Sequence, residues 1–327
     1  MTKIIGESMP DIPWQDRPKG NRDLVWRYDN NPVISRKNVD TAKSIFNSAV
    51  IKYKDGFIGL FRVDDKALIS HIHLGRSKDG INWDIEQEPI EFITEDEETG
   101  KFVRGFDPRV CFIEDRYYIT WANIIEGEGG TPGLAYTFDF KTFHQLPNIF
   151  PLLNRNAVLF PRKIDGKFGL LNRPSSRGHC LNGSIWYSES PDIEYWGKHR
   201  LVMQPKVGWQ EAKIGPGPIP IETDEGWLIF YHGVVNMATG YMYSMGAALL
   251  DLEKPWKVLY RAKSAVLFPE EIYERTGDCT NVIFPCAALA DADTGRIAVY
   301  YGSGDSVVGL AFCDVNEVVD YIKKDSE

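Results

Sequence analysis

With 327 residues, of which 43% are hydrophobic and 25% charged, the chain has the composition of a folded globular protein, because a disordered chain has fewer apolar residues and more net charge. The formal net charge of -9 argues against a nucleic-acid backbone or an anionic membrane as the main partner. No apolar run approaches the roughly 18 residues of a membrane span, and we expect a cytoplasmic protein.

The first predicted element is a polar, proline-bearing N-terminal arm, residues 1–30. It is long enough to reach a neighbouring subunit, which leaves a homo-oligomer open. Beyond the arm, strands near residues 32–35 and 47–53 are predicted to pair with the last segment of the chain. That pairing would close a ring of sheets and remove exposed sheet edges.

An internal repeat organises the rest of the chain. Five segments share a short apolar strand, a small or hydroxyl residue, an acidic turn and then an aromatic or apolar residue: 74–83, 134–143, 185–196, 247–256 and 310–318. Their starts are about 50 to 65 residues apart, the spacing of a four-stranded propeller blade. Coincidence among surface turns is the alternative reading. Three tryptophans at repeat positions, Trp83, Trp196 and Trp256, are expected to pack between blades.

Between the repeats, the sequence supplies strands. The runs 116–121, 226–231 and 296–301 are short and rich in β-branched or aromatic residues, and we predict that they are inner blade strands. A single helix is predicted at residues 316–324, with Val318, Val319 and Ile322 on one face. The predicted fold is therefore all-β, a five-bladed β-propeller with a short C-terminal helix, in which residues 1–327 form a single domain.

Asp107 is the first candidate for chemistry, because it precedes an apolar strand at a point where the strand would enter the central channel. A carboxyl group there can act as a general acid. The alternative reading is that Asp107 caps a turn before Pro108, with Arg109 as its ion pair.

Four basic residues interrupt blades where a solvated charge is less expected: Arg155, Arg173, Lys213 and His232. Together they could neutralise a phosphate dianion. Taken singly, each could be a structural ion pair.

No metal is expected, because His71 and His73 alternate on one strand without a third ligand nearby. The five cysteines are scattered and odd in number, which predicts free thiols.

Several longer motifs together resemble glycoside hydrolase family 130, the mannoside phosphorylases, over nearly the whole chain. They include Phe46-Asn47-Ser48-Ala49-Val50, Asp107-Pro108-Arg109-Val110, Lys213-Ile214-Gly215, Tyr231-His232-Gly233 and Phe284-Pro285-Cys286-Ala287. The resemblance implies that Asp107 is the general acid and that Arg155, Arg173, Lys213 and His232 bind phosphate. It also implies a mannose site formed by Asn47, Ser48, Arg62, Asp64 and Asp305.

The same resemblance assigns Phe106, His179, Tyr241 and Phe284 to substrate binding. Phe106 stands where the family pattern has Tyr, and residues 178–184 depart from the usual family sequence. Loss of polar groups that pair with sugar hydroxyls changes specificity, so the leaving sugar stays open between glucose, mannose and N-acetylglucosamine.

The resulting hypothesis is inverting phosphorolysis of a β-mannoside, which does not require a second carboxylate because phosphate is already a nucleophilic anion. The expected products are α-mannose 1-phosphate and a shortened sugar, and the expected linkage is β-1,4. Inorganic phosphate is a co-substrate, and no cofactor is expected. The alternatives are a β-mannosidase that uses water on the same fold and a non-catalytic propeller that binds glycans.

Overall fold

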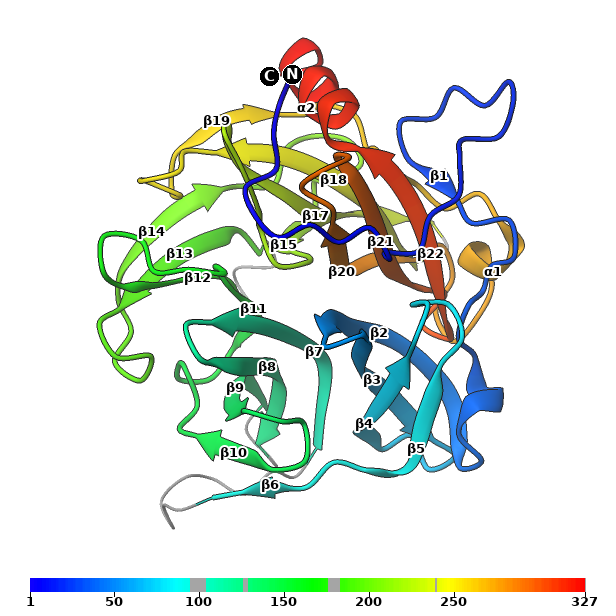
Figure 1. The fold of residues 1–327 in the computed structure, drawn as a ribbon, viewed down its shortest axis with the longest axis vertical. Helices are drawn as coiled ribbons and strands as arrows, with labels where there is room; N and C mark the ends of the chain where they lie inside the picture. Colours follow the sequence, from blue (N-terminus) through cyan, green and yellow to red (C-terminus); the bar gives the residue numbers. More distant parts are fainter. Residues whose placement is uncertain (95–103, 126–128, 176–182, 239, 327) are drawn as a thin grey trace.

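A computed structural model describes residues 1–94, 104–125, 129–175, 183–238 and 240–326. Nearly all of its regular structure is β-strand, arranged as five sheets around a central axis (Figure 1). The predicted five-bladed propeller is confirmed. No helix in the described ranges has the length and apolar character needed to cross a membrane.

The first three blades follow one another along the chain. Blade 1 contains β2 (Ala42–Tyr53), β3 (Gly56–Asp65), β4 (Ser70–Ser77) and β5 (Asp84–Pro89). Blade 2 contains β7 (Arg104–Ile113), β8 (Arg116–Ile125), β9 (Gly129–Thr137) and β10 (Phe143–Leu146), with β6 (Phe92–Ile93) added at its edge. Blade 3 contains β11 (Asn154–Leu159), β12 (Phe168–Pro174), β13 (Ile185–Ser190) and β14 (Gly197–Met203).

The last two blades depart from this simple order. In blade 4, β15 (Lys213–Pro216) and β16 (Ile221–Thr223) both pair with β17 (Gly226–Met237), followed by β18 (Gly240–Leu250) and β19 (Val258–Arg261). Blade 5 contains β20 (Ile283–Ala290), β21 (Arg296–Ser303) and β22 (Val307–Asp314), and its fourth strand is β1 (Trp26–Arg27). The helical segments are η1 (Arg36–Asn38), α1 (Ile272–Arg275) and α2 (Val315–Lys324).

The N-terminal part of the chain closes the ring. Strand β1 pairs with β22 through Trp26 and Phe312, and Ile34 forms a further bridge to Val308. The prediction that residues near 32–35 pair with the last segment is therefore confirmed. The same prediction for residues 47–53 is wrong, because they belong to β2 and pair with β3 in blade 1.

The repeat corresponds to one structural unit. Each repeated segment covers all or part of the third strand of a blade, namely β4, β9, β13, β18 or β22, together with the turn after it or, in the fifth segment, the start of α2. In the first turn, the Ser77 hydroxyl accepts a hydrogen bond from the Gly80 amide, and Asp79 accepts from the Ile81 amide. The shared hydroxyl and acidic residues are thus explained by local turn bonding, which satisfies backbone donors.

The position of the inner strands was predicted wrongly. The runs at 116–121, 226–231 and 296–301 are strands, but they lie in β8, β17 and β21, the second strand of each blade. The strands that begin each blade are β7, β15 with β16, and β20. Strands β7 and β20 break register with their neighbours, and β15 and β16 have only four and three residues, so these strands do not show a long regular apolar pattern.

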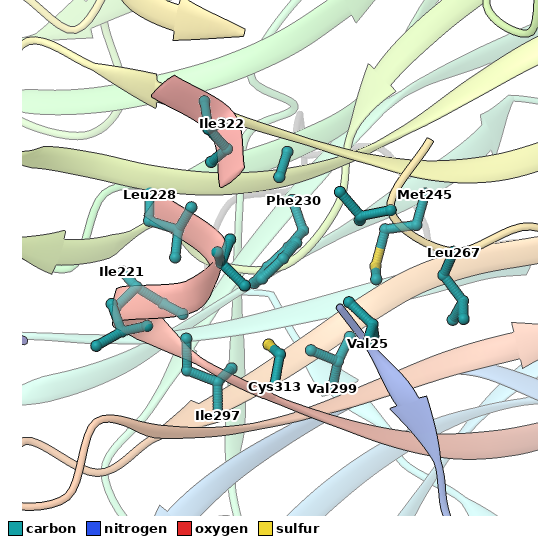
Figure 2. Close-up of a cluster of buried hydrophobic side chains, with 14 of the residues drawn as sticks. Val25, Ile221, Leu228, Phe230, Met245, Leu267, Ile297, Val299, Cys313 and Ile322 are labelled. Atoms are coloured by element: carbon teal, nitrogen blue, oxygen red, sulfur yellow. The ribbon is translucent and has the colours of Figure 1, made fainter. Parts of the chain in front are cut away.

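Helix α2 covers the outer edge of the ring beside blades 4 and 5. Its Val318, Val319 and Ile322 are buried, which confirms the predicted helix and its apolar face. Figure 2 shows Ile322 above Leu228 and Phe230 of β17, with Ile297 and Cys313 of blade 5 nearby. The Asp314 side chain accepts hydrogen bonds from the first amides of the helix and so caps it.

The N-terminal arm, residues 1–30, contacts blades 4 and 5 of its own chain. The Ile5 amide donates to the Glu222 carbonyl at 2.8 Å, and the Met9 amide donates to the Asp291 carboxylate at 2.7 Å. The arm therefore connects blades 4 and 5 before it supplies β1. A second copy of the chain bound through this arm stays a prediction.

The closing strand is held by an aromatic cluster, which gives a test of ring closure. Trp26 is 4% exposed and packs edge-on against Trp14, and it also contacts Phe312. We expect Trp26→Ala to lower the free energy of unfolding by about 3 to 5 kcal/mol, measured by urea denaturation, because it removes a large buried ring. Tyr195, 76% exposed, is the matched aromatic control, and Tyr195→Ala should change stability by less than about 0.5 kcal/mol. Equal effects of the two substitutions would contradict this account of closure.

Candidate active site

Breaks in strand register turn polar side chains toward the axis. The first strands β2, β7, β11 and β20 each lose register, between Phe46 and Ala49, Phe106 and Arg109, Arg155 and Val158, and Pro285 and Ala287. Asn47 and Asp107 lie within two of these breaks and have positive φ angles of 47° and 56°. A bulge changes the direction of a side chain relative to the regular alternation, which explains why these polar residues interrupt apolar strands.

Asp107 is held by two donors from blade 1. Its Oδ1 accepts hydrogen bonds from Asn47 Nδ2 at 2.8 Å and from Arg62 Nη1 at 3.1 Å. The Asp107 side chain is 12% exposed. Both of these donors bind one carboxyl oxygen, which fixes the orientation of the group and presents Oδ2 as the oxygen that would carry an exchangeable proton.

Arg62 links Asp107 to Asp64. Its guanidinium forms a two-pronged pair with Asp64, at 3.0 and 2.9 Å, and it lies over the rings of Phe46 and Phe106. Burial alone would lower the pKa of Arg62, but the Asp107 and Asp64 carboxylates raise it above its usual value. Arg62 is therefore a permanent cation between the two acids.

The alternative in which Arg109 is the ion pair of Asp107 is wrong. Arg109 is buried and donates instead to the backbone carbonyls of Asp107, Pro108 and Gly217. It stabilises the backbone of the bulge, and Arg62 takes the role of the charged partner. Arg62 is distant in sequence, so the adjacent Arg109 gave a misleading signal.

The acidic side of the site, which contains Asp64 and Asp107, also includes Asp305 and Ser48. Asp305 lies in the turn between β21 and β22 with a φ angle of 49°. Burial raises the pKa of Asp305, Arg62 opposes this effect and Asp107 adds to it. Ser48, next to Asn47 in the β2 bulge, is fully buried, and its hydroxyl has no partner among the described residues.

The predicted basic residues lie together on blades 3 and 4. Arg155 of β11 pairs directly with Arg173 of β12 across the sheet. Arg173 Nη1 lies 2.9 Å from Nε2 of His232, and the His232 ring stacks on Phe284 at a centroid distance of 4.4 Å. No described carboxylate forms an ion pair with Arg155, Arg173 or Lys213. Within the described chain, the reading of these residues as separate structural ion pairs is therefore wrong.

The protonation of His232 follows from its neighbours. Burial, with Arg173 and Lys213 adding to it, holds the pKa of His232 well below its usual value, so the ring is neutral. A guanidinium only donates, so Nε2 accepts from Arg173 and the ring proton sits on Nδ1. His232 Nδ1 and Arg173 Nε are both buried without a described partner. Such donors are expected where an anion binds.

Lys213 is a cation whose charge is easily lost. Burial, with Arg173 and Arg155 adding to it, lowers the pKa of Lys213 to about 8. Its Nζ lies 4.8 Å from the ring centre of Tyr241 and 5.3 Å from that of Tyr243. Burial likewise lowers the pKa of Arg173 to about 10. The pKa values show the cost of gathering positive charge in a partly desolvated site.

Phe106 joins the acidic and basic sides. Its ring lies between Arg62, at 4.6 Å, and Arg155, at 5.8 Å. The charge of Asp107 also acts on Arg173, where it opposes the effect of burial. The two groups predicted from the sequence therefore belong to one site.

Some features of the site were predicted and others were not. The structure brings together Asp107, Arg155, Arg173, Lys213, His232, Asn47, Arg62, Asp64, Phe106, Phe284, Asp305 and Tyr241, the last at the exposed rim. His179 lies outside the described residues. Sequence reasoning missed Tyr243, which contacts Lys213 and His232 from the strand that carries Tyr241. Its alternation with Tyr241 on one strand was the available signal.

Gly215 explains how Arg173 and His232 can meet. A Cβ atom at Gly215 would lie 2.5 Å from the His232 ring and 3.1 Å from Arg173 Nη1. Only glycine leaves room for this contact.

Among the described residues, no group of three histidine, cysteine or acidic side chains gathers in a way that could hold a metal ion.

The propeller thus brings a largely buried acid close to a cluster of cations that have no carboxylate partner among the described residues. The model of glycoside hydrolase family 130, described as β-1,4-mannooligosaccharide phosphorylase, matches residues 6–324. The chain belongs to this family, which confirms the resemblance seen in the sequence motifs.

Individual relatives cover most of the chain. A β-1,4-mannooligosaccharide phosphorylase from Ruminococcus albus is 54% identical over 99% of each chain. A 4-O-β-D-mannosyl-D-glucose phosphorylase from Bacteroides fragilis is 30% identical, over 91% of this chain and 80% of that protein. The solved structure of a Listeria innocua β-1,2-mannobiose phosphorylase with β-1,2-mannobiose superposes with a TM-score of 0.81, at 29% identity, and covers 92% of this chain and 99% of that chain.

The pKa of Lys213 predicts how anion binding depends on pH. A protonated Lys213 attracts an anion, so its contribution is present below pH 8 and is lost as the pH rises through that value. Sulfate is the suitable probe, because its charge does not change in this range. Since a hydrogen bond to a charged group contributes about 1.5 to 3 kcal/mol, we expect sulfate affinity, measured by calorimetry, to fall up to about tenfold between pH 7 and 9, a range in which Arg173 stays charged.

A variant separates Lys213 from other titrating groups. An arginine keeps its charge to a higher pH than a lysine, so Lys213→Arg should show a much flatter pH dependence between pH 7 and 9. An equally steep fall in this variant would contradict the assignment of the titration to Lys213.

Proposed function

We propose that this protein is an inverting β-mannoside phosphorylase that acts on β-1,4-linked mannooligosaccharides and uses inorganic phosphate as the attacking group. The observation that carries the proposal is the contact of Arg173 with His232 beside Lys213 and Arg155, with no described carboxylate paired to these cations. The similarity to phosphorylases acting on β-mannosides supports the choice of substrate.

The proposed reaction divides between the two sides of the site. Asn47, Ser48, Arg62, Asp64 and Asp305 would bind the nonreducing mannose, and Asp107 would deliver a proton to the glycosidic oxygen through a mannose hydroxyl. Phosphate held by Arg155, Arg173, Lys213 and His232 would attack the anomeric carbon from the opposite face. The C–O bond to the leaving sugar breaks as the bond to phosphate forms, which gives α-mannose 1-phosphate.

One catalytic carboxylate is enough for this chemistry. An inverting hydrolase needs a second carboxylate to activate water, whereas phosphate arrives as an anion and needs placement and charge compensation. We therefore infer that no cofactor takes part. Phe106, Phe284 and Tyr241 would border the leaving sugar, where loss of the tyrosine hydroxyl at position 106 removes one polar contact.

We place the reaction in the cytoplasm. The four cysteines that the structure describes, Cys111, Cys279, Cys286 and Cys313, are unpaired, as is usual in a reducing compartment.

Phosphate dependence tests the proposed reaction. With β-1,4-mannobiose as substrate, we expect mannose 1-phosphate to appear only when phosphate is present and cleavage to stop when phosphate is removed. Product analysis by ion chromatography measures both sugars. Free mannose released at an equal rate without phosphate would show a hydrolase instead.

Asp107 is the residue whose removal should have the largest effect. Because general acid catalysis contributes about 100- to 10,000-fold, we expect Asp107→Asn to lower kcat by at least about 100-fold in phosphorolysis. Asp55, exposed and bonded to Lys78, is the matched control, and Asp55→Asn should leave kcat unchanged. Normal turnover by a folded Asp107→Asn protein would contradict the assigned role and favour a binding function for the propeller.

A further inference from the structure

Glu274 of α1 is a buried charged residue outside the site described above. It is fully inaccessible, yet its carboxylate accepts five hydrogen bonds. Arg27 contributes two of them, at 2.7 and 2.9 Å, and the Tyr301 hydroxyl contributes one at 2.9 Å. The amides of Glu270 and Glu271 contribute the others. A carboxylate buried in this way is fixed in one orientation, because any movement would leave donors unpaired.

Arg27 belongs to β1, the strand that closes the ring. Besides Glu274, it donates to the Phe268 carbonyl at 2.8 Å and to the Glu270 carboxylate at 3.1 Å. Burial alone would lower the pKa of Arg27, but its bond to Glu274 raises it above the usual value, so this partner stays charged. The pair therefore fastens the segment from 268 to 274 to the N-terminal strand.

The chain after α1 runs directly to the acidic side of the active site. The Val282 amide donates to the Glu274 carbonyl at 2.9 Å, which closes residues 275–281 into a loop anchored at α1. From this loop, the Cys279 amide donates to the Gly304 carbonyl at 3.1 Å, and the Gly304 amide donates in turn to the Val282 carbonyl at 3.2 Å. These bonds hold the turn that carries Asp305.

Two glycines allow this loop and this turn to approach closely. A Cβ atom at Gly277 would lie 2.2 Å from the Gly304 carbonyl oxygen, and one at Gly304 would lie 2.3 Å from the Thr276 carbonyl oxygen. Both residues have positive φ angles, 152° and 56°. The backbones are therefore in direct contact, and a displacement of the loop is transmitted to residue 305.

The loop also contacts two other parts of the site. The Asp278 carboxylate accepts hydrogen bonds from Lys43 and Ser44, which lie just before Asn47 on β2. The Asn281 carbonyl accepts from the Tyr243 amide at 2.9 Å. The loop thus touches the Asp107-binding strand, the turn of Asp305 and the tyrosine beside Lys213.

We propose that Glu274, paired with Arg27, is a positioning residue that holds the loop 275–281 against the Gly304–Ser306 turn and so sets the position of Asp305 for binding the sugar. The role rests on the proposed function, since Asp305 is assigned to the mannose by that proposal. Glu274 itself touches neither sugar nor phosphate. Its effect is carried by the backbone contacts between the loop and the turn.

Glu274→Gln tests this role with little change of shape. The substitution places an amide NH2 group against donors and removes the charge that balances Arg27, so the loop should loosen. Since small displacements of a binding group can cost up to about 100-fold, we expect the KM for β-1,4-mannobiose to rise about tenfold, with the KM for phosphate changed less than about twofold. Hydrogen exchange of the amides in 276–282 and 304–306, measured without substrate, should become faster.

Two further variants make the result decisive. Tyr301→Phe removes one donor to Glu274 and should give the same pattern with smaller amplitude, and it decides the matter if Glu274→Gln is not recovered folded. Lys78→Ala breaks an exposed ion pair with Asp55 in blade 1 and should leave KM and exchange at 276–282 unchanged.

The readouts separate the two proposals. Unchanged exchange in the loop and turn, or equal changes in both KM values, would overturn the positioning role. A wild-type protein without phosphate-dependent turnover would instead refute the proposed function, while faster exchange in Glu274→Gln would still show that Glu274 holds the loop.

Discussion

The site depends on holding the positive charges of Arg155, Arg173 and Lys213 close together although no carboxylate in the described ranges pairs with them. Burying cations costs free energy unless an anion compensates, and the lowered pKa values of Lys213 and Arg173 record this cost. The sheets supply the restraint: Arg155 and Arg173 face each other across paired strands, and Phe284 supports the His232 ring. A site built in this way is stabilised when an external anion enters it.

On the acidic side of the site, the requirement is a fixed orientation of the Asp107 carboxyl group. Asp107 has a positive φ angle and its carboxyl group is oriented by Asn47 and Arg62, all within bulged or adjacent strands of the first two blades. Phe106 separates Arg62 from Arg155, so the acid and the cations share one site while the ion pairs of Arg62 stay with Asp64 and Asp107. The acid, its donors and the cations come from blades 1 to 4, so the site depends on how the blades are arranged around the ring.

The sequence predicted the architecture well where local chemistry repeats. The hydroxyl and acidic residues of each third-strand turn bond locally, as Ser77 and Asp79 do, so they recur and reveal the blades. The runs predicted to be inner strands are second strands instead, because bulges interrupt the regular pattern of the first strands β2, β7, β11 and β20. The alternative reading that paired Arg109 with Asp107 is wrong, since adjacency in sequence says little about partners when a bulge redirects the side chains. Two donors to Glu274 are the nearby amides of residues 270 and 271, but Arg27 and Tyr301 are distant in sequence, so the sequence did not reveal its burial or its charged partner.

The central claim is that the cations face an external phosphate across the sugar from Asp107. A crystal structure of the Asp107→Asn protein with phosphate and β-1,4-mannobiose tests it most directly. We expect phosphate in contact with Arg155, Arg173 and Lys213, with one oxygen about 3 to 3.5 Å from the anomeric carbon on the face away from residue 107. Phosphate bound on the same face as residue 107, or mannose bound with those cations turned away from it, would contradict the account.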